Sequence, residues 1–480
     1  MSRPNVVLIV MDTARARTVL GRPDVMPNLH RIADEGVTFE NAFTTGPWTL
    51  PSHASMFTGQ YTSDHGTHAG SRRFDPDVPT LAELLQGAGY RTVGISNNTW
   101  VSPDFGFDCG FDTFDVAWEL VDGGVDLPTI AKSNEGTTAQ ITAVCRNLLD
   151  SEAPKTILNA AFSKLLRRRF DDGALVTNWR IRRRLSNGRA HRPFFMFVNY
   201  LEPHLEYSPP DRFRPDWLDA SDVEDVNQDA WAYICGSEEM DERDFEALTS
   251  LYEGELAYLD YRIGQVYDFL DERDLLDETA LFVVGDHGEN IGEHGLMDHQ
   301  YCLYDTLLHV PLVARYPSEY DGGEHREELF EVRDLYPTIL DLAGVDVPAD
   351  DGVSTTRLGD GEGREYVLGE YLTPQPSMEA LAERVDDVPD EVRRYDRGLR
   401  SIRTREWKYI QATDGTDELY DVRVDPLETD DVVSANDDVR DDLAARLESD
   451  LGEFEQSSDD HGGEIDGATE RRLEDLGYLQ

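Results

Sequence analysis

An aspartate and a histidine stand next to each other in a glycine-rich segment, and they carry the donor atoms of a metal site. Asp286 and His287 follow an apolar run, and the segment 285–295 reads Gly-Asp-His-Gly-Glu-Asn-Ile-Gly-Glu-His-Gly, with His299 after it. Carboxylate and imidazole groups bind divalent ions, and glycine lets the backbone approach closely. Acidic residues are common in this chain, so the prediction of a metal site depends on the whole pattern and not on Asp286 alone.

A threonine at the start of a predicted helix is the candidate nucleophile. The sequence Gly-Pro-Trp before Thr49 predicts a turn, and residues 50–57 predict a helix with Pro51 in its first turn. The N-terminus of a helix favours an anion. An oxyanion ester bound there would have the Thr49 hydroxyl beside its central atom. Alternatively, Thr49 only caps the helix and takes no part in catalysis.

Two other polar side chains follow predicted strands. Asp12 ends the apolar run 5–11, and His204 comes shortly after the run 194–199. In open α/β sheets, functional groups gather beyond the carboxyl ends of the strands. We therefore expect Asp12, His204 and Asp286 at one edge of a sheet, although a single histidine after a strand is often structural.

Alternating strands and helices predict an α/β fold with a large, doubly wound, mostly parallel sheet flanked by helices. Near-continuous apolar runs are typical of strands that are buried on both faces. The predicted strands are 5–11, 92–95, 194–199, 280–285 and 310–314, and the predicted helices are 81–87, 256–270 and 332–342. Short antiparallel strands at 407–411 and 418–421 predict a smaller C-terminal α+β subdomain. The predicted domains are therefore 1–372 and 373–480, the latter with an acidic tail.

The charge of the chain is strongly negative. Lys+Arg 44 against Asp+Glu 96 gives a net charge of −52 over 480 residues. Such a field repels phosphates, so nucleic-acid binding is disfavoured. An acidic, lysine-poor composition is typical of proteins that stay soluble in molar salt, where self-repulsion is screened. We expect a halophilic source.

Residues 164–192 form a basic, amphipathic stretch in this acidic chain. Lys164 and many arginines alternate there with apolar residues such as Trp179 and Ile181. The stretch suits peripheral contact with an anionic membrane surface or an anionic substrate carrier. Alternatively, it is an insertion whose arginines pair with the acidic body of the protein.

Taken together, these segments resemble the sulfatase family of the alkaline-phosphatase superfamily. The resemblance rests on residues 5–12, 49–59, 194–204, 286–295 and 310–312, and it spans roughly residues 3–345. It implies a large α/β domain followed by a smaller C-terminal sheet. It also implies an enzyme that acts on sulfate esters with the help of a metal ion.

The chain departs from the family pattern at the nucleophile. The family signature is Cys (or Ser)-x-Pro-Ser-Arg, whose first residue becomes formylglycine; here it reads Thr49-Leu-Pro-Ser-His53. Threonine cannot become the aldehyde. Where the family has two acidic residues after the first strand, this chain has Asp12-Thr13 and so lacks one carboxylate. Residues 96–98 replace an early lysine of the family. The chain thus resembles the threonine-nucleophile branches of the superfamily, such as its phosphodiesterases and its lipoteichoic-acid and phosphoethanolamine transferases.

By this resemblance, one divalent ion (Mn²⁺, Zn²⁺, Mg²⁺ or Ca²⁺) would be held by four side chains. The implied metal ligands are Asp12, Thr49, Asp286 and His287. The implied catalytic residues are Thr49, His204 and His299, and the implied substrate-binding residues are His53 and Asn98. A metal ion lowers the pKa of a bound hydroxyl and neutralises charge on sulfuryl or phosphoryl oxygens.

Three functions remain open from the sequence. The first is hydrolysis or transfer of a sulfate ester, on a saccharide or glycan precursor. The second is phosphodiesterase or phosphotransferase chemistry at the same site. The third is a non-catalytic anion- or glycan-binding descendant of the fold. Since no stretch resembles a signal peptide or a membrane span, we expect a cytoplasmic protein, in peripheral contact with the inner membrane face if the basic stretch binds lipid.

Overall fold

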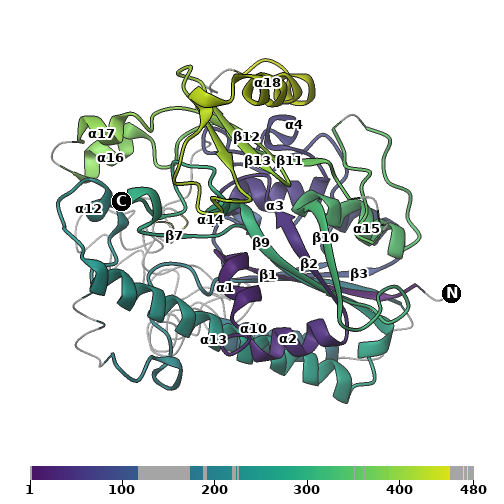
Figure 1. The fold of residues 1–480 in the computed structure, drawn as a ribbon. Coiled ribbons are helices and arrows are strands. Elements are labelled where there is room, and N and C mark those ends of the chain that lie inside the picture. The colour runs from purple at the N-terminus through teal and green to yellow at the C-terminus, as the bar shows by residue number, and fades with distance from the viewer. Residues whose placement is uncertain are drawn as a thin grey trace, which may run out of the picture.

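A central sheet of eight strands organises the molecule (Figure 1). The computed structural model describes residues 3–116, 173–186, 192–218, 223, 226–350, 352–359, 361, 363–385, 388–454, 469 and 473. The strands lie in the order β10-β2-β9-β6-β1-β5-β3-β4. Their bounds are β1 Asn5–Met11, β2 Val37–Phe43, β3 Arg91–Ser96, β4 Thr113–Val116, β5 Phe194–Tyr200, β6 Thr279–Gly285, β9 His309–Arg315 and β10 Glu324–Glu331.

The sheet is mostly parallel, as predicted. β1 pairs in parallel with β5 and β6, while β9 runs antiparallel to β2 and β6. The five predicted strands correspond to β1, β3, β5, β6 and β9. Strands β2, β4 and β10 were not predicted. Their more polar sequences, such as Glu324–Glu331, do not form the apolar runs that identify buried strands.

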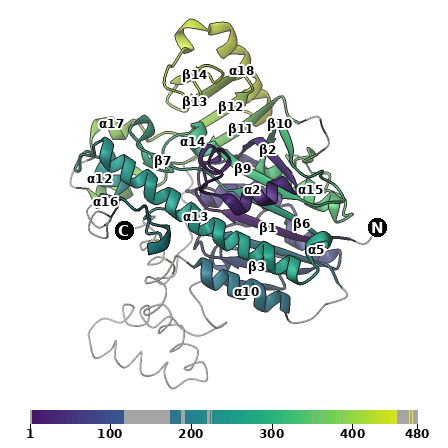
Figure 2. The ribbon, with the colours of Figure 1, turned by 60° about the horizontal axis from the view of Figure 1, so that its bottom comes forward.

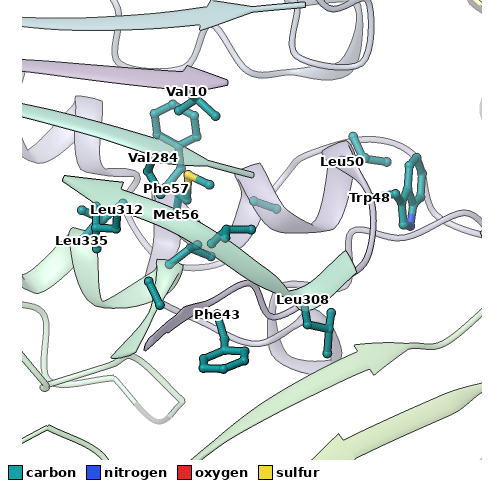
Figure 3. Packing of buried hydrophobic residues seen from close by; sticks show 14 of the residues in the cluster. Val10, Phe43, Trp48, Leu50, Met56, Phe57, Val284, Leu308, Leu312 and Leu335 are labelled. Atoms are coloured by element: carbon teal, nitrogen blue, oxygen red, sulfur yellow. The ribbon is translucent and has the colours of Figure 1, made fainter. Parts of the chain in front are cut away.

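Helices cover both faces of the sheet. Successive residues of a strand point to opposite faces, so Val6, Leu8 and Val10 of β1 lie in one apolar core, and Val7, Ile9 and Met11 lie in the other. The first core is closed by α3 (Thr49–Thr58), α5 (Leu81–Gly87) and α15 (Leu335–Leu342), and the second by α2 (Pro27–Asp34), α10 (Ala174–Ser186) and α13 (Glu242–Glu272). Figure 3 shows part of the first core, in which Phe57 and Met56 of α3 lie beside Val10 and Val284.

A smaller antiparallel sheet follows, and Figure 2 shows it with α18 at one end of the molecule. Its order is β11-β12-β13-β14, and its strands are β11 Tyr366–Tyr371, β12 Leu399–Thr404, β13 Trp407–Ala412 and β14 Asp417–Asp421. Leu443 and Leu447 of α18 (Asp437–Leu451) cover one face. This confirms the C-terminal subdomain, whose sheet begins before residue 373; the boundary of the domains stays a prediction.

Short elements complete the described chain. The remaining helices are α1 Ala16–Gly21, α4 Thr62–His65, α12 Ala230–Ile234, α14 Asp305–Leu308, α16 Met378–Arg384 and α17 Asp390–Arg393, and a two-stranded ribbon pairs β7 Asn290–Ile291 with β8 Met297–Asp298. No helix in the described ranges is both long enough and apolar enough to cross a membrane. Of the basic stretch 164–192, residues 164–172 and 187–191 lie outside the described part, and 173–186 contain α10.

Candidate active site

Two buried carboxylates meet at the carboxyl ends of neighbouring central strands. β1 and β6 pair in parallel with Met11 opposite Gly285, so the next residues, Asp12 and Asp286, lie side by side. Both side chains are buried. Among the described residues, Asp12 Oδ1 and Asp286 Oδ2 have no hydrogen-bond partner. A buried polar atom without a partner is costly, and a cation is one way to satisfy two carboxylates at once.

His287 completes this group with a ring nitrogen that is fixed in orientation. Its Nδ1 lies 2.9 Å from the carbonyl oxygen of Gly288. Because a carbonyl only accepts, Nδ1 carries the proton and Nε2 presents its lone pair. Burial, and then repulsion by His299, hold the pKa of His287 well below its usual value, so the ring is neutral. A neutral imidazole is the form that binds metal ions.

Thr49 faces this nitrogen from the start of α3. Its Oγ1 lies 3.2 Å from His287 Nε2, and Asn98 Nδ2 donates to it at 3.3 Å. The helix has Pro51 in its first turn, as predicted, but it begins at Thr49, one residue before the predicted start. The cap residue is Trp48, and no side-chain cap bond is present, so the interpretation of Thr49 as a simple helix cap is wrong. Ser52 Oγ donates to the backbone oxygen of Asp286 at 2.7 Å and ties the helix to β6.

The distances around His287 fit a metal ion. A tetrahedral ion with bonds of about 2.1 Å separates its ligand atoms by about 3.4 Å. His287 Nε2 lies 3.6 Å from Asp12 Oδ1, 3.5 Å from Asp286 Oδ2 and 3.2 Å from Thr49 Oγ1. The structure thus brings together the four predicted ligands, and their donor atoms suit a divalent cation.

The raised pKa values of the two carboxylates also favour a bound cation. Burial raises the pKa of Asp12 to about 7, although hydrogen bonding from Asn98 opposes this. Burial and the charge of Asp12 raise the pKa of Asp286 well above its usual range. Two carboxylates held this close without a cation do not readily ionise together. A bound cation would remove this penalty.

Asn98, which was predicted to bind substrate, lies in the site and contacts Asp12, a predicted metal ligand. Its Nδ2 donates to Asp12 Oδ2 at 2.6 Å, and its backbone N–H donates to Asn199 Oδ1 at 3.2 Å. Asn199 is a site residue that sequence reasoning missed. Its place near the carboxyl end of β5, at the same edge as Asp12, is the signal that could have identified it.

His53 also lies close to the carboxylates. Its Nδ1 lies 2.9 Å from the carbonyl oxygen of Thr49 and 3.6 Å from Asp286 Oδ2. Its ring packs edge-on against Phe107 and Phe197. Burial lowers the pKa of His53 to about 4. The ring is therefore a neutral neighbour of Asp286, and its predicted role in substrate binding stays a prediction.

The two remaining predicted residues form a line of imidazoles with His287. The ring centre of His299 lies 4.5 Å from that of His287 and 5.2 Å from that of His204. Burial opposes charge on His299, but Asp298 and Glu289 raise its pKa well above the usual value. Burial, and then His299, lower the pKa of His204 to about 4. One charged and two neutral imidazoles therefore share one wall of the site.

Known proteins resemble this chain along nearly its whole length. The family model for sulfatases matches residues 4–345. Choline-sulfatase of Rhizobium meliloti is 26% identical over 457 residues, with 89% of this chain and 81% of that protein covered. N-acetylglucosamine-6-O-sulfatase of Bacteroides thetaiotaomicron is 25% identical over 477 residues, covering 89% and 82%.

Solved structures share the fold. BT4656, in complex with its substrate D-glucosamine-2-N,6-O-disulfate, has a TM-score of 0.66 at 19% identity, covering 96% of this chain and 100% of that one. The phosphonate monoester hydrolase of Agrobacterium radiobacter has a TM-score of 0.67 at 22% identity, covering 93% and 95%. The family match covers well over half of the chain. The chain therefore belongs to the sulfatase family of the alkaline-phosphatase superfamily, and it is an enzyme with hydrolases as relatives.

Proposed function

We propose that this enzyme cleaves or transfers a sulfate ester of a saccharide through a covalent ester on Thr49. The observation that carries the proposal is the position of Thr49 Oγ1, 3.2 Å from His287 Nε2 and beside two buried carboxylates, each with one oxygen that has no hydrogen-bond donor in the described chain. Threonine replaces the formylglycine precursor at this position, so the hydroxyl itself must be the nucleophile. A divalent ion held by Asp12, Asp286, His287 and Thr49 would lower the pKa of this hydroxyl and neutralise charge on the ester oxygens.

In the proposed reaction, the Thr49 hydroxyl loses its proton to water and Oγ1 attacks the sulfur atom. The bond from sulfur to the alcohol oxygen breaks, and His299 gives that oxygen a proton. Asn98 holds both Asp12 and the threonine oxygen in place. Water then attacks the sulfur of the Thr49 ester and gives one proton to His299 and the other to Oγ1, so that sulfate is released and the Thr49 hydroxyl is restored. An acceptor alcohol in place of water makes the reaction a transfer.

The charge of the site supports a singly charged group. The side chains in contact with Thr49 and its carboxylate neighbours, within the described residues, are imidazoles and amides. A dianionic phosphate monoester needs more positive charge than these groups supply. A sulfate ester is a monoanion, and so is a phosphodiester, which is the second candidate substrate.

A cavity lined in part by residues that closely follow His299 in the chain is our candidate for binding a saccharide as the alcohol part. It has a volume of about 320 Å³ and lies between the loop that follows His299 and the small sheet. Its walls include Tyr301, Tyr395, Arg394 and Glu418. Tyr301 and Tyr395 stack with ring centres 5.5 Å apart. Aromatic faces beside charged groups suit a sugar ring, which has both apolar C–H surfaces and hydroxyl groups.

Intact-protein mass spectrometry tests the nucleophile. The protein is loaded with Mn²⁺ in high salt and incubated with p-nitrophenyl sulfate or, separately, bis-p-nitrophenyl phosphate. We expect release of nitrophenol from the sulfate and a mass gain of about 80 Da, both lost in Thr49→Ala. Thr58→Ala is the matched control, because Thr58 lies on the same helix and its hydroxyl bonds to Ala54 O.

The outcome also decides between the two ester classes. An adduct that forms only with the phosphodiester would replace the sulfate ester by a phosphate ester in this proposal. Turnover that survives in Thr49→Ala would remove Thr49 as the nucleophile. Saccharide binding is tested with Tyr395→Ala, for which KM for a sulfated sugar should rise and kcat should change little.

Contact with an anionic membrane surface is the second part of the proposal. On α10, Leu175 and Trp179 are exposed at 47% and 45%, and Arg182 and Arg183 are exposed near them. Other arginines of the helix bind the protein body instead, as Arg184 does through Asp115. Trp179→Ser with Arg183→Ser should reduce co-sedimentation with phosphatidylserine vesicles, while Arg31→Ser on α2 should not. Unchanged sedimentation would refute lipid binding by α10; a cytoplasmic location stays a prediction.

A further inference from the structure

A second cluster of potential metal ligands lies on the loop between β6 and α14. The ribbon β7–β8 pairs Asn290 with Asp298, which brings Glu289 next to Asp298 and His299. One ligand atom from each of these three side chains lies within 4.8 Å of the other two. His299 Nδ1 is 2.5 Å from Asp298 Oδ1 and 3.5 Å from Glu289 Oε1.

Glu289 is the residue that needs an explanation. Its side chain is completely buried, and neither carboxylate oxygen has a hydrogen-bond partner among the described residues. His299 Nδ1 carries at most one proton, and the nearer acceptor for it is Asp298. A histidine–aspartate pair therefore takes that proton, and Glu289 keeps only a longer ion pair, 3.5 Å from His299 Nδ1, with no hydrogen bond from the described residues, in an interior where a buried carboxylate is costly.

We propose that Glu289, Asp298 and His299 bind a second divalent cation, separate from the one between Asp12 and Asp286. Two carboxylates and one imidazole are a donor set for Zn²⁺ or Mn²⁺. An imidazolium at His299 balances one carboxylate, whereas a divalent ion balances both. The 3.5 Å separation of Glu289 Oε1 from His299 Nδ1 matches the roughly 3.4 Å between ligand atoms of a tetrahedral site. The shorter separation to Asp298 would have to widen by rotation of that carboxylate, whose Oδ1 also accepts from the backbone N–H of His299.

The second cation would act through His299. The carboxylates face Nδ1 of this ring, so a cation there leaves Nε2 as the nitrogen that carries a proton. The ring also lies 4.5 Å from that of His287, a ligand of the first site. His299 is the one residue that the second metal site shares with the proposed ester chemistry. The second site is argued from Glu289, so it does not depend on whether the substrate is a sulfate or a phosphate ester.

Metal content measured on variants tests the second site. Protein loaded with Mn²⁺ and freed of loose ions is analysed by inductively coupled plasma mass spectrometry. We expect two ions per chain in the wild type, one in Asp286→Asn, one in Glu289→Gln and none in the double variant. Glu293→Gln is the matched control, because it removes the same charge from the same loop. Glu293 pairs with Arg15 and lies outside the cluster.

The Asp286→Asn variant gives the decisive result. If it keeps one Mn²⁺ and the additional change Glu289→Gln removes that ion, the second site is established. If it holds no Mn²⁺ while its circular dichroism equals that of the wild type, or if the wild type holds one ion that Glu289→Gln leaves in place, the proposal is overturned. Since the readout is bound metal and not turnover, it stands apart from the test of Thr49.

Discussion

Removal of the metal ion should make the stability of the protein fall as the pH rises, and Asp12 should account for a definite part of this fall. Burial raises the pKa of Asp12 from the ordinary value of 3.8 to about 7. Between these values, the folded metal-free protein holds a proton that the unfolded chain has lost. The folded state then binds more protons, so its free energy of unfolding decreases as pH increases, and the decrease ends above about pH 7.

The size of the effect follows from the pKa shift. Between pH 5 and pH 8, the folded and unfolded states differ in protonation of Asp12 over roughly two pH units. At 1.36 kcal/mol per unit, the free energy of unfolding falls by about 3 kcal/mol. The value belongs to Asp12 together with Asp286, because the two carboxylates titrate as a pair. Bound metal keeps both ionised in the folded state and removes the fall.

Urea unfolding in constant KCl measures this difference. The wild type in EDTA is compared with Asp12→Asn from pH 5 to pH 8, since asparagine keeps an oxygen that accepts from Asn98. We expect the wild type to lose about 3 kcal/mol more than the variant over this range, and Mn²⁺ to stabilise the wild type more than the variant, which lacks only a first-site ligand. Asp271→Asn on the surface is the control for loss of one charge. Equal pH dependence in wild type and Asp12→Asn would refute this reasoning.

Three further predictions concern the loop at the site, the small sheet and the surface. A Cβ at Gly288 would lie 2.0 Å from Thr306 O, so Gly288→Ala should displace His287 and weaken Mn²⁺ binding in calorimetry at least tenfold. Gly87 has open space around it, so Gly87→Ala should leave the affinity unchanged; equal affinities of the two variants would contradict this. Buried Lys408 pairs with Asp305 at 2.6 Å and Glu428 at 3.0 Å, so Lys408→Met should cost about 3–5 kcal/mol in urea unfolding, and a loss below about 1 kcal/mol would count against it. Because the net charge is −52, the melting temperature should rise from 0.1 M to 3 M KCl as self-repulsion is screened, and a flat curve would exclude this effect.

Much of the fold could be predicted because its signals are local. The run from Asn5 to Met11 is apolar at every position but the first, which is typical of a strand with two buried faces. Helix α3 was predicted from a glycine-proline turn and Pro51 at its start. Strand β10, in contrast, carries several charged residues and is polar over most of its length. Its place beside β2 depends on pairing across the sheet, and no local pattern expresses this.

The sequence by itself determined the family and the α/β class, because apolar runs and the residue types at strand and helix ends are local properties. The four ligands Asp12, Thr49, Asp286 and His287 stay a prediction from the family resemblance. Only the tertiary structure decided how these atoms are spaced, since the register of β1 against β6 sets the two carboxylates side by side. It also decided which groups are left without donors in the interior. Glu289 is one of many acidic residues in the sequence, and it became a candidate ligand only because the chain folds back through β7 and β8 and excludes water from it.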